Sequence, residues 1–476
     1  MKLHDKQREI VVSPARFKLI RAGRKGGKTA EEVETIVFKA TASASKLGLT
    51  KITFPTGRKV LYKAPTQVQA RQIIWEALKS RLNGVGKANE QTLEMRVPNE
   101  DGETSVIKIG GWENRENDRG LADVIHITFD EIDTLKGFFI SWQEIYRPMF
   151  LDTGGTANFI GTPKKENPNL KRLEKEWGNR PDVALFKFTS LDNPYLSQVE
   201  LEALKTEYEG NMQAYKQEIL AEYVEDSGAL FKYTALIDMF SNTITKGNEK
   251  YLIVDVADDG SDKTIFNFFQ GLESYRIEKF ERLNTEMIIT QIRDYASQDK
   301  IPYSQIAVDA IGVGAGVASS SYLDGVVAYK SSFAPFKIDR DEVKLPNVHY
   351  LANAPRYAEY ANLRSQCVFT LADLVNNHKF AVRTEDVRVK EHIIEELSHY
   401  QDISKGDGKR LATHKEDVKA LIGRSPDISD TLIMRIFFHL KERLQPMTSE
   451  QANDLSRKIK ERFDMNENRQ VINSTK

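Results

Sequence analysis

The chain has 476 residues, more than one hydrophobic core usually accommodates, so we expect two or three domains. Its 68 Lys and Arg residues nearly balance its 69 Asp and Glu residues, which excludes a strongly basic nucleic-acid coat and leaves only local patches for DNA binding. The single cysteine, Cys367, excludes an intramolecular disulfide framework and a Cys-rich zinc site.

The beginning of the chain, MKLHDKQREI, is charged and lacks the apolar region of a signal peptide. No run approaches the roughly 18 apolar residues that a membrane span requires. We therefore expect a soluble, cytosolic protein without membrane attachment.

Short apolar runs alternate with helix-length segments over the first part of the chain. This alternation predicts an α/β domain with a mostly parallel sheet. A polar, helical stretch then leads out of the domain, from Ser197 to Glu225. The predicted strands lie at 16–21, 59–63, 124–129 and 157–160.

A second α/β zone begins with the apolar run at residues 251–254. The expected organisation is a first domain at 1–225, a linker at 226–249, a second domain at 250–442 and a polar tail at 443–476. In the tail, Leu455, Ile459 and Phe463 recur at the spacing of one amphipathic helix.

A phosphate-binding loop is predicted between the first strand and a following helix. Small residues allow successive backbone N–H groups to face phosphates, Lys28 reaches the β- and γ-phosphate oxygens, and the Thr29 hydroxyl ligates Mg²⁺. The apolar residues Val33, Ile36 and Val37 share one face of the helix. The loop comprises Ala22, Gly23, Arg24, Lys25, Gly26, Gly27, Lys28 and Thr29, with Ala22 where the common pattern has glycine.

Two adjacent carboxylates, Asp130 and Glu131, follow the apolar strand 124–129. Ligands of open α/β sheets bind at the carboxyl ends of the strands. We expect Asp130 to hold the Mg²⁺ of bound ATP and Glu131 to polarise the attacking water.

Phosphoryl transfer also needs positive charge on the transition state. Arg119 precedes the acidic strand and Arg24 lies inside the loop, so either arginine is a candidate. The turn Gly161-Thr162-Pro163 ends a further strand and is placed to sense the γ-phosphate.

The second zone carries a different set of acidic residues. Asp255 and Asp309 each end a buried apolar strand, and Asp309 is followed by a glycine-rich turn. Asp427 and Asp430 share one face of a later helix at i, i+3 spacing. Buried carboxylates need a neutralising partner, and such a set can hold two divalent ions roughly 3.5–4 Å apart for phosphodiester cleavage.

Hard oxygen ligands favour Mg²⁺ or Mn²⁺ over zinc at this second site. Both Asp427 and Asp430 fit the helical position, and we favour Asp430 as the main ligand with Asp427 as an auxiliary one. One of the loop residues Asp258, Asp259 and Asp262 is also able to bind a metal through water.

The order of these motifs resembles the large terminase subunit of tailed bacteriophages over nearly the whole chain. This resemblance implies a P-loop ATPase followed by an RNase H-like nuclease. Gln7 looks like the adenine-contacting glutamine of that family, Arg119 like its trans-acting arginine finger, and residues 161–163 like its coupling turn. Asp255, Asp309 and the SPDISD segment look like its three acidic positions.

The resemblance further implies a motor that packages double-stranded DNA into a procapsid and cuts concatemeric DNA. Its expected partners are a small terminase subunit and the portal protein, on which the subunits form a ring. The polar tail is the expected docking segment, and the expected location is the host cytoplasm and transiently the procapsid, not the mature virion.

Two other functions are compatible with the same motifs. One is a helicase-like DNA translocase whose second domain only binds nucleic acid. The other is a resolvase- or transposase-like nuclease with a regulatory P-loop.

Overall fold

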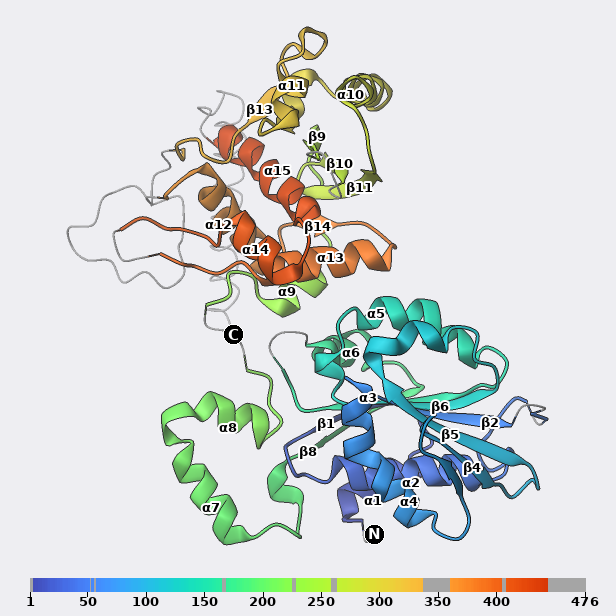
Figure 1. Cartoon of the computed structure of the whole chain (residues 1–476). Helices are drawn as coiled ribbons and strands as arrows, with labels where there is room; N and C mark the ends of the chain where they lie inside the picture. Colours follow the sequence, from blue (N-terminus) through green and yellow to red (C-terminus); the bar gives the residue numbers. More distant parts are fainter. Residues whose placement is uncertain are drawn as a thin grey trace, which may run out of the picture. The chain divides into compact units, whose positions relative to one another are not determined.

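The computed structural model describes residues 3–51, 53–54, 57–164, 168–224, 228–257, 263–336, 360–404 and 408–443. The chain forms two compact units, Met1–Ser227 and Gly228–Lys476 (Figure 1). In the described ranges, no helix is both long and apolar enough to cross a lipid bilayer.

The first unit is built around an eight-stranded sheet with the order β3-β4-β5-β2-β6-β7-β1-β8. Only β3 and β4 join antiparallel to their neighbours, so the predicted mostly parallel sheet is confirmed. The four predicted strands are β1 (Phe17–Ala22), β2 (Arg58–Ala64), β6 (Val124–Phe129) and β7 (Thr156–Gly161). The others are β3 (Lys87–Asn89), β4 (Glu94–Pro98), β5 (Thr104–Gly111) and β8 (Val183–Phe188).

Strands β6, β7 and β1 are adjacent and parallel. Their carboxyl ends therefore meet at one edge of the sheet. Because Asp130, Gly161 and the phosphate loop come at the ends of these strands, the sheet gathers three sequence motifs that are distant in the chain.

Helices of the first unit supply the rest of the framework. Helix α2 begins at Lys28 and buries Val33, Ile36 and Val37 against the sheet, as their spacing predicts. The helices are α1 (Asp5–Val12), α2 (Lys28–Thr41), α3 (Gln67–Ala70), α4 (Glu76–Arg81), α5 (Phe138–Ser141), α6 (Asn169–Trp177), α7 (Gln198–Glu207) and α8 (Met212–Glu218). The last two lie within the segment predicted to be helical.

The second unit contains a six-stranded mixed sheet with the order β13-β12-β9-β10-β11-β14. Strands β9, β10 and β11 pair antiparallel, whereas β12 is parallel to β9 and β13 to β12. This sheet agrees with the predicted RNase H-like α/β organisation. The strands are β9 (Lys250–Asp255), β10 (Thr264–Gln270), β11 (Glu273–Phe280), β12 (Ile306–Asp309), β13 (Val327–Tyr329) and β14 (Ala381–Val382).

Both faces of this sheet are covered. Alternate residues of β9 join two separate cores: Leu252 and Val254 pack in one, Tyr251 and Ile253 in the other with α12 and α15. Asp255 shares the face of Ile253, because side chains two apart in a strand point to the same side. The helices are α9 (Tyr233–Asp238), α10 (Thr285–Asp299), α11 (Val313–Ala318), α12 (Leu363–Asn376), α13 (Val387–Ser398), α14 (Lys415–Ile422) and α15 (Asp427–Arg443).

Part of the segment 226–249, expected to be a linker, is built into the second unit. Helix α9 buries Ala235 and Leu236 in the core shared with α12 and α15. The expected tail 443–476 lies, apart from the end of α15, outside the described residues.

Candidate active sites

The predicted phosphate loop connects β1 to α2 in the first unit. Glycine is required at two of its positions. A Cβ atom at Gly23 would lie 2.3 Å from the carbonyl oxygen of Ile219, and Gly27 has a φ of 106°. The loop ends where α2 begins, so its last N–H groups belong to a helix N-terminus, which favours anions.

Lys28 is the residue that joins the three motifs. Its Nζ lies 3.0 Å from Oε1 of Glu131 and donates a hydrogen bond of 2.6 Å to Oγ1 of Thr162. Thr162 in turn donates to the carbonyl oxygen of Ala22 at 3.0 Å. Lys28, the expected phosphate ligand, therefore contacts both the expected catalytic carboxylate and the expected coupling turn.

The adjacent carboxylates differ in environment. Asp130 is buried and accepts hydrogen bonds from the Tyr62 hydroxyl and from the backbone N–H of Glu131. Burial and the neighbouring Glu131 raise the pKa of Asp130 to about 6. Glu131 has a φ of 49°, a left-handed conformation that is strained for a residue with a side chain.

Asp133 is a site residue that the sequence analysis missed. One carboxylate oxygen accepts the backbone N–H of Lys164 at 3.0 Å, and the other accepts that of Leu170 at 2.7 Å. Burial raises the pKa of Asp133 to about 7. Asp133 thus links two parts of the chain by hydrogen bonds: the turn that contains Glu131 and the segment that follows Pro163.

A network of buried hydrogen bonds around Glu32 was also not predicted from the sequence. Glu32 accepts hydrogen bonds from the Thr128 hydroxyl on β6 and from the Asn158 amide, at 3.1 Å, on β7. It therefore fixes α2 to the two strands that end in the other motifs. Only its position in an apolar helix distinguishes Glu32 in the sequence.

Gln7 lies against the back of the loop. Its Nε2 donates to the carbonyl oxygen of Gly27 at 2.7 Å, and its Oε1 accepts the backbone N–H of His4 at 2.8 Å. His4 itself contacts the carbonyl oxygen of Gly26 at 3.1 Å. The amide that the family resemblance assigns to adenine is here engaged in supporting the phosphate loop.

The two candidate arginines are both largely exposed. Arg119 has 48% of its side chain exposed and pairs with Glu116 and Glu144. The neighbouring Asp118 is buried and pairs with Lys63, which anchors the loop that presents Arg119. Arg24 pairs with Glu218 at the end of α8.

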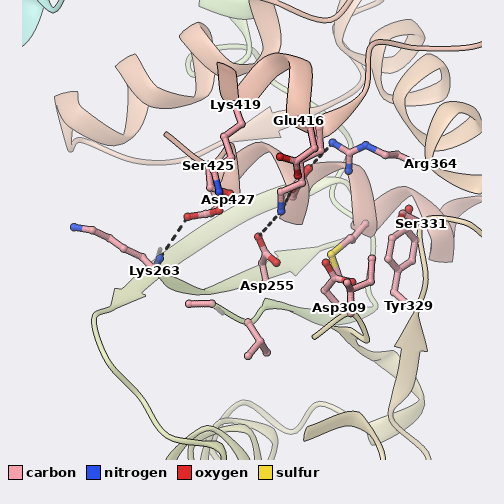
Figure 2. Close-up of a pocket in the computed structure, with 16 residues that line it drawn as sticks. Asp255, Lys263, Asp309, Tyr329, Ser331, Arg364, Glu416, Lys419, Ser425 and Asp427 are labelled. Carbon is pink, nitrogen blue, oxygen red and sulfur yellow. Dashed lines mark hydrogen bonds and ion pairs between the residues drawn. The ribbon is translucent and has the colours of Figure 1, made fainter. Parts of the chain in front are cut away.

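In the second unit, the predicted acidic residues line one pocket of about 280 Å³ (Figure 2). Asp255 comes from the end of β9 and Asp309 from the end of β12, while α15 contributes the other two. The glycine-rich turn has a steric cause, because a Cβ atom at Gly314 would lie 1.9 Å from the carbonyl oxygen of Asp309. The structure thus brings together Asp255, Asp309, Asp427 and Asp430.

Two basic residues that were not predicted lie among these carboxylates. Nζ of Lys415 is 2.6 Å from Oδ2 of Asp430 and 3.9 Å from Oδ2 of Asp255. Nη2 of Arg364 donates to Oδ1 of Asp430 at 2.8 Å. Lys415 begins a helix and Arg364 lies in the first turn of α12, and neither has a sequence signature.

Burial and these contacts shift the pKa values of the aspartates in different directions. Burial would raise the pKa of Asp430, but Arg364 and Lys415 hold it below its usual value. Burial raises the pKa of Asp255 well above its usual range against the effect of Lys415, and burial raises that of Asp309 to about 6.

The expected metal ligands fit this geometry only in part. Among the described residues, no group of three His, Cys, Asp or Glu side chains is arranged to hold a metal ion. Lys415 lies between Asp255 and Asp430 and supplies the positive charge there. The donor chemistry nevertheless fits Mg²⁺ or Mn²⁺, and Oδ1 of Asp309 is buried without a hydrogen-bond partner. Asp258, Asp259 and Asp262 lie outside the described residues.

The two helical aspartates are not equivalent. Asp430 is almost fully buried at the centre of the pocket. Asp427 is half-buried and accepts the backbone N–H of Lys263 at 3.4 Å, and Figure 2 shows it on the Lys263 side of the pocket. This geometry favours Asp430 as the central carboxylate.

No protein-family model matches the sequence, and no curated protein matches it either. Solved structures do match. The large terminase of a thermophilic bacteriophage is 14% identical, with a TM-score of 0.39, over 88% of this chain and 97% of that one. The ATPase domain of the Thermus phage P74-26 large terminase is 22% identical, with a TM-score of 0.38, over 47% of this chain and 94% of that one.

A third similar structure is the nuclease domain of the large terminase subunit of bacterial virus Sf6. It is 21% identical, with a TM-score of 0.35, over 44% of this chain and 97% of that one. These structures come from the family that the order of motifs resembles.

Proposed function

We propose that this chain is a viral DNA-packaging motor that hydrolyses ATP to move double-stranded DNA and cuts it with a metal-dependent nuclease. The observation that supports the proposal is the presence of two separate clusters of charged side chains in one chain. One centres on Lys28 in the first unit, and the other on the carboxylates around Lys415 in the second.

In the ATPase unit, the roles follow from the contacts of Lys28. When a nucleotide is bound, its phosphates attract Lys28 away from Glu131. Glu131 is then an unpaired carboxylate able to accept a proton from the attacking water. Thr29 and Asp130 would hold Mg²⁺, which shields the phosphate charge.

Coupling is expected to start at the same lysine. Displacement of Lys28 removes the donor to Thr162, at the carboxyl end of β7. Asp133 joins the Glu131 turn to Lys164, just beyond the coupling turn. Movement at the catalytic carboxylate is therefore passed directly to residues 161–164.

In the nuclease unit, Asp255, Asp309 and Asp430 would hold two Mg²⁺ or Mn²⁺ ions, with Asp427 as an auxiliary ligand. Such ions activate water and stabilise the charge on the phosphodiester. Lys415 and Arg364 keep Asp430 ionised and oriented toward the pocket.

The remaining parts of the proposal concern assembly. The subunits would form a ring on the portal protein of a procapsid in the host cytoplasm, with a small terminase subunit as a partner. The protein would leave before the virion matures.

A plasmid-cleavage assay with Mg²⁺ or Mn²⁺, with and without ATP, tests the proposal on the unmodified chain and on Asp255→Asn. We expect metal-dependent cleavage that Asp255→Asn abolishes, together with ATP hydrolysis that it spares. Absence of cleavage in both proteins would favour the helicase-like translocase. DNA translocation that survives Lys28→Ala would favour a nuclease with a regulatory P-loop.

A further inference from the structure

The helix that carries two of the four pocket aspartates begins without a side-chain cap of its own. Helix α15 starts at Asp427, and the residue before it is Pro426, whose side chain has no hydrogen-bonding group. The first N–H groups of a helix have no partner within the helix. Ser429, between Asp427 and Asp430, is fully buried, so its N–H needs a partner from elsewhere in the fold.

Glu396 on α13 supplies that partner. Its Oε2 accepts the backbone N–H of Ser429 at 2.7 Å, and its side chain is fully buried. Its Oε1 accepts from Nη1 of Arg424, which lies just before α15. Glu396 therefore binds the chain on both sides of Pro426 and Asp427.

A second contact from the same end of α13 reaches the side chain of Asp430. The hydroxyl of Tyr400, just after α13, accepts a hydrogen bond from Nη2 of Arg364 at 2.7 Å, and the same nitrogen donates to Oδ1 of Asp430 at 2.8 Å. Helices α13 and α15 also pack against each other (Figure 1). The backbone beside Asp430 and its carboxylate are thus both fixed from α13.

A buried carboxylate is a costly way to cap a helix, because a charge must be paired and hydrogen-bonded to be buried. A serine, threonine or aspartate in place of Pro426 would cap α15 locally. Such a cap would satisfy the helix without fixing its start to another element. Glu396 does fix that start, and the distance of Asp430 from the strand aspartates Asp255 and Asp309 depends on it.

We propose that Glu396 is a positioning residue that sets the first turn of α15, so that Asp430 and Asp427 face the strand aspartates across the pocket. Glu396 itself does not line the pocket. It therefore acts through α15 and not by direct contact with a metal ion or DNA. This inference rests on the proposed nuclease function.

The test separates the reach of the Glu396 side chain from its charge. Glu396→Gln keeps the length and an acceptor oxygen for Ser429, whereas Glu396→Asp keeps the charge and is one methylene shorter. We expect Glu396→Asp to weaken Mn²⁺ binding to the full chain about 10-fold or more, as loss of a partner behind a metal ligand does. Titration calorimetry without DNA measures it. Glu396→Gln should bind Mn²⁺ nearly as the unmodified chain does, whereas a role confined to the ion pair with Arg424 predicts the opposite order.

Hydrogen exchange of the first turn of α15 gives a readout that needs neither metal nor DNA. In the metal-free chain, the amide of Ser429 should exchange faster in Glu396→Asp than in Glu396→Gln, because only the longer side chain still accepts its hydrogen. Plasmid cleavage at saturating Mn²⁺ should be slower in Glu396→Asp, since Asp430 is displaced even when metal is bound. Exchange of α10, which packs in the other core of the second unit, is the control for folding.

Glu395→Gln is the matched control. Glu395 is the neighbouring residue on α13 and pairs with Nη2 of the same Arg424 at 2.8 Å, but it is not the partner of Ser429. This variant should leave Mn²⁺ binding and the exchange of Ser429 unchanged.

Three results would overturn the inference. They are Mn²⁺ binding by Glu396→Asp as tight as that of the unmodified chain, a loss in Glu396→Gln as large as that in Glu396→Asp, and an equal loss in Glu395→Gln. Absence of both Mn²⁺ binding and cleavage in the unmodified chain would instead overturn the proposed nuclease function.

Discussion

The ammonium group of Lys28 lies 3.0 Å from the carboxylate of Glu131, so the expected phosphate ligand and the expected catalytic base neutralise each other. One oxygen of the Glu131 carboxylate therefore faces the ammonium group rather than a water molecule. Under the proposed ATPase function, nucleotide binding would separate the pair before water is activated. Under the proposed ATPase function, the contact would suppress hydrolysis until the phosphates are in place.

Glu131→Gln should abolish ATP turnover while preserving nucleotide binding. Loss of a general base lowers the rate about 100-fold or more. ATP should bind at least as tightly as before, because the carboxylate that competes for Lys28 is gone. Steady-state phosphate release and a fluorescent-nucleotide titration measure the two effects. Glu90→Gln, at an exposed carboxylate, is the control, and unchanged hydrolysis in Glu131→Gln would refute the catalytic assignment.

Much of the first unit was predictable because its motifs are local. The loop 22–29 and the pair Asp130-Glu131 each lie next to an apolar strand, and the sheet then joins them. Asp133 was not predictable, since its importance depends on a contact with Lys164, which is distant from it in the chain. A single sequence does not record such pairs.

Arg119→Ala should reduce ATP hydrolysis by about 1,000-fold if this arginine completes the site of a neighbouring subunit. Its exposure and its pairing with surface carboxylates suit a residue that reaches another molecule. Mixing Arg119→Ala with Glu131→Gln should restore part of the ATP hydrolysis. The Arg119→Ala subunit supplies the carboxylate of Glu131, and the Glu131→Gln subunit supplies the arginine. Arg81→Ala is the control at another exposed arginine. If mixing restores nothing, a role within the same subunit is favoured.

In the second unit, Asp430→Asn should abolish the proposed Mn²⁺-supported plasmid cleavage, whereas Asp427→Asn should retain a measurable fraction. The reason is that Asp430 is central and buried, while Asp427 is half-buried at the side of the pocket. ATP hydrolysis should be unaffected in both variants and serves as the control for folding. Equal losses of cleavage would mean that the two aspartates hold the ions jointly, and cleavage that survives in Asp430→Asn would contradict the site.

The four acidic residues of this pocket were predictable because two end buried strands and two share a helical face. The basic residues were not. Lys415 and Arg364 lie in ordinary polar sequence, and only the fold brings them to Asp430. The four aspartates alone therefore overstate the negative charge of the pocket, because Lys415 and Arg364 offset part of it.

Lys415→Gln should lower the Mn²⁺ concentration that half-saturates cleavage. Lys415 lies 2.6 Å from Asp430 and competes with any cation for the same oxygens. Removal of this charge should tighten metal binding about 10-fold, equivalent to about 1.4 kcal/mol. Lys419→Gln, from the same helix and pocket, should leave the half-saturating concentration unchanged. A higher concentration in Lys415→Gln would show that the lysine assists metal binding.

Asp133 should make the stability of the first unit depend on pH. Its pKa is about 7 in the folded protein, because of burial, against an ordinary value of 3.8. The folded state therefore retains a proton that the unfolded state has lost. Stability due to this group is complete below about pH 4 and declines as the pH rises toward 7, by at most about 4 kcal/mol.

Asp133→Asn removes this dependence, so the free energy of unfolding of the unmodified chain should fall relative to the variant between about pH 5 and pH 7.5. Urea unfolding followed by tryptophan fluorescence reports on the first unit alone, because all four tryptophans, Trp75, Trp112, Trp142 and Trp177, lie within it. Asp5→Asn, at an exposed carboxylate, should follow the unmodified chain at each pH. Parallel pH profiles for Asp133→Asn and the unmodified chain would show that Asp133 is ionised throughout and that its two backbone contacts outweigh its burial.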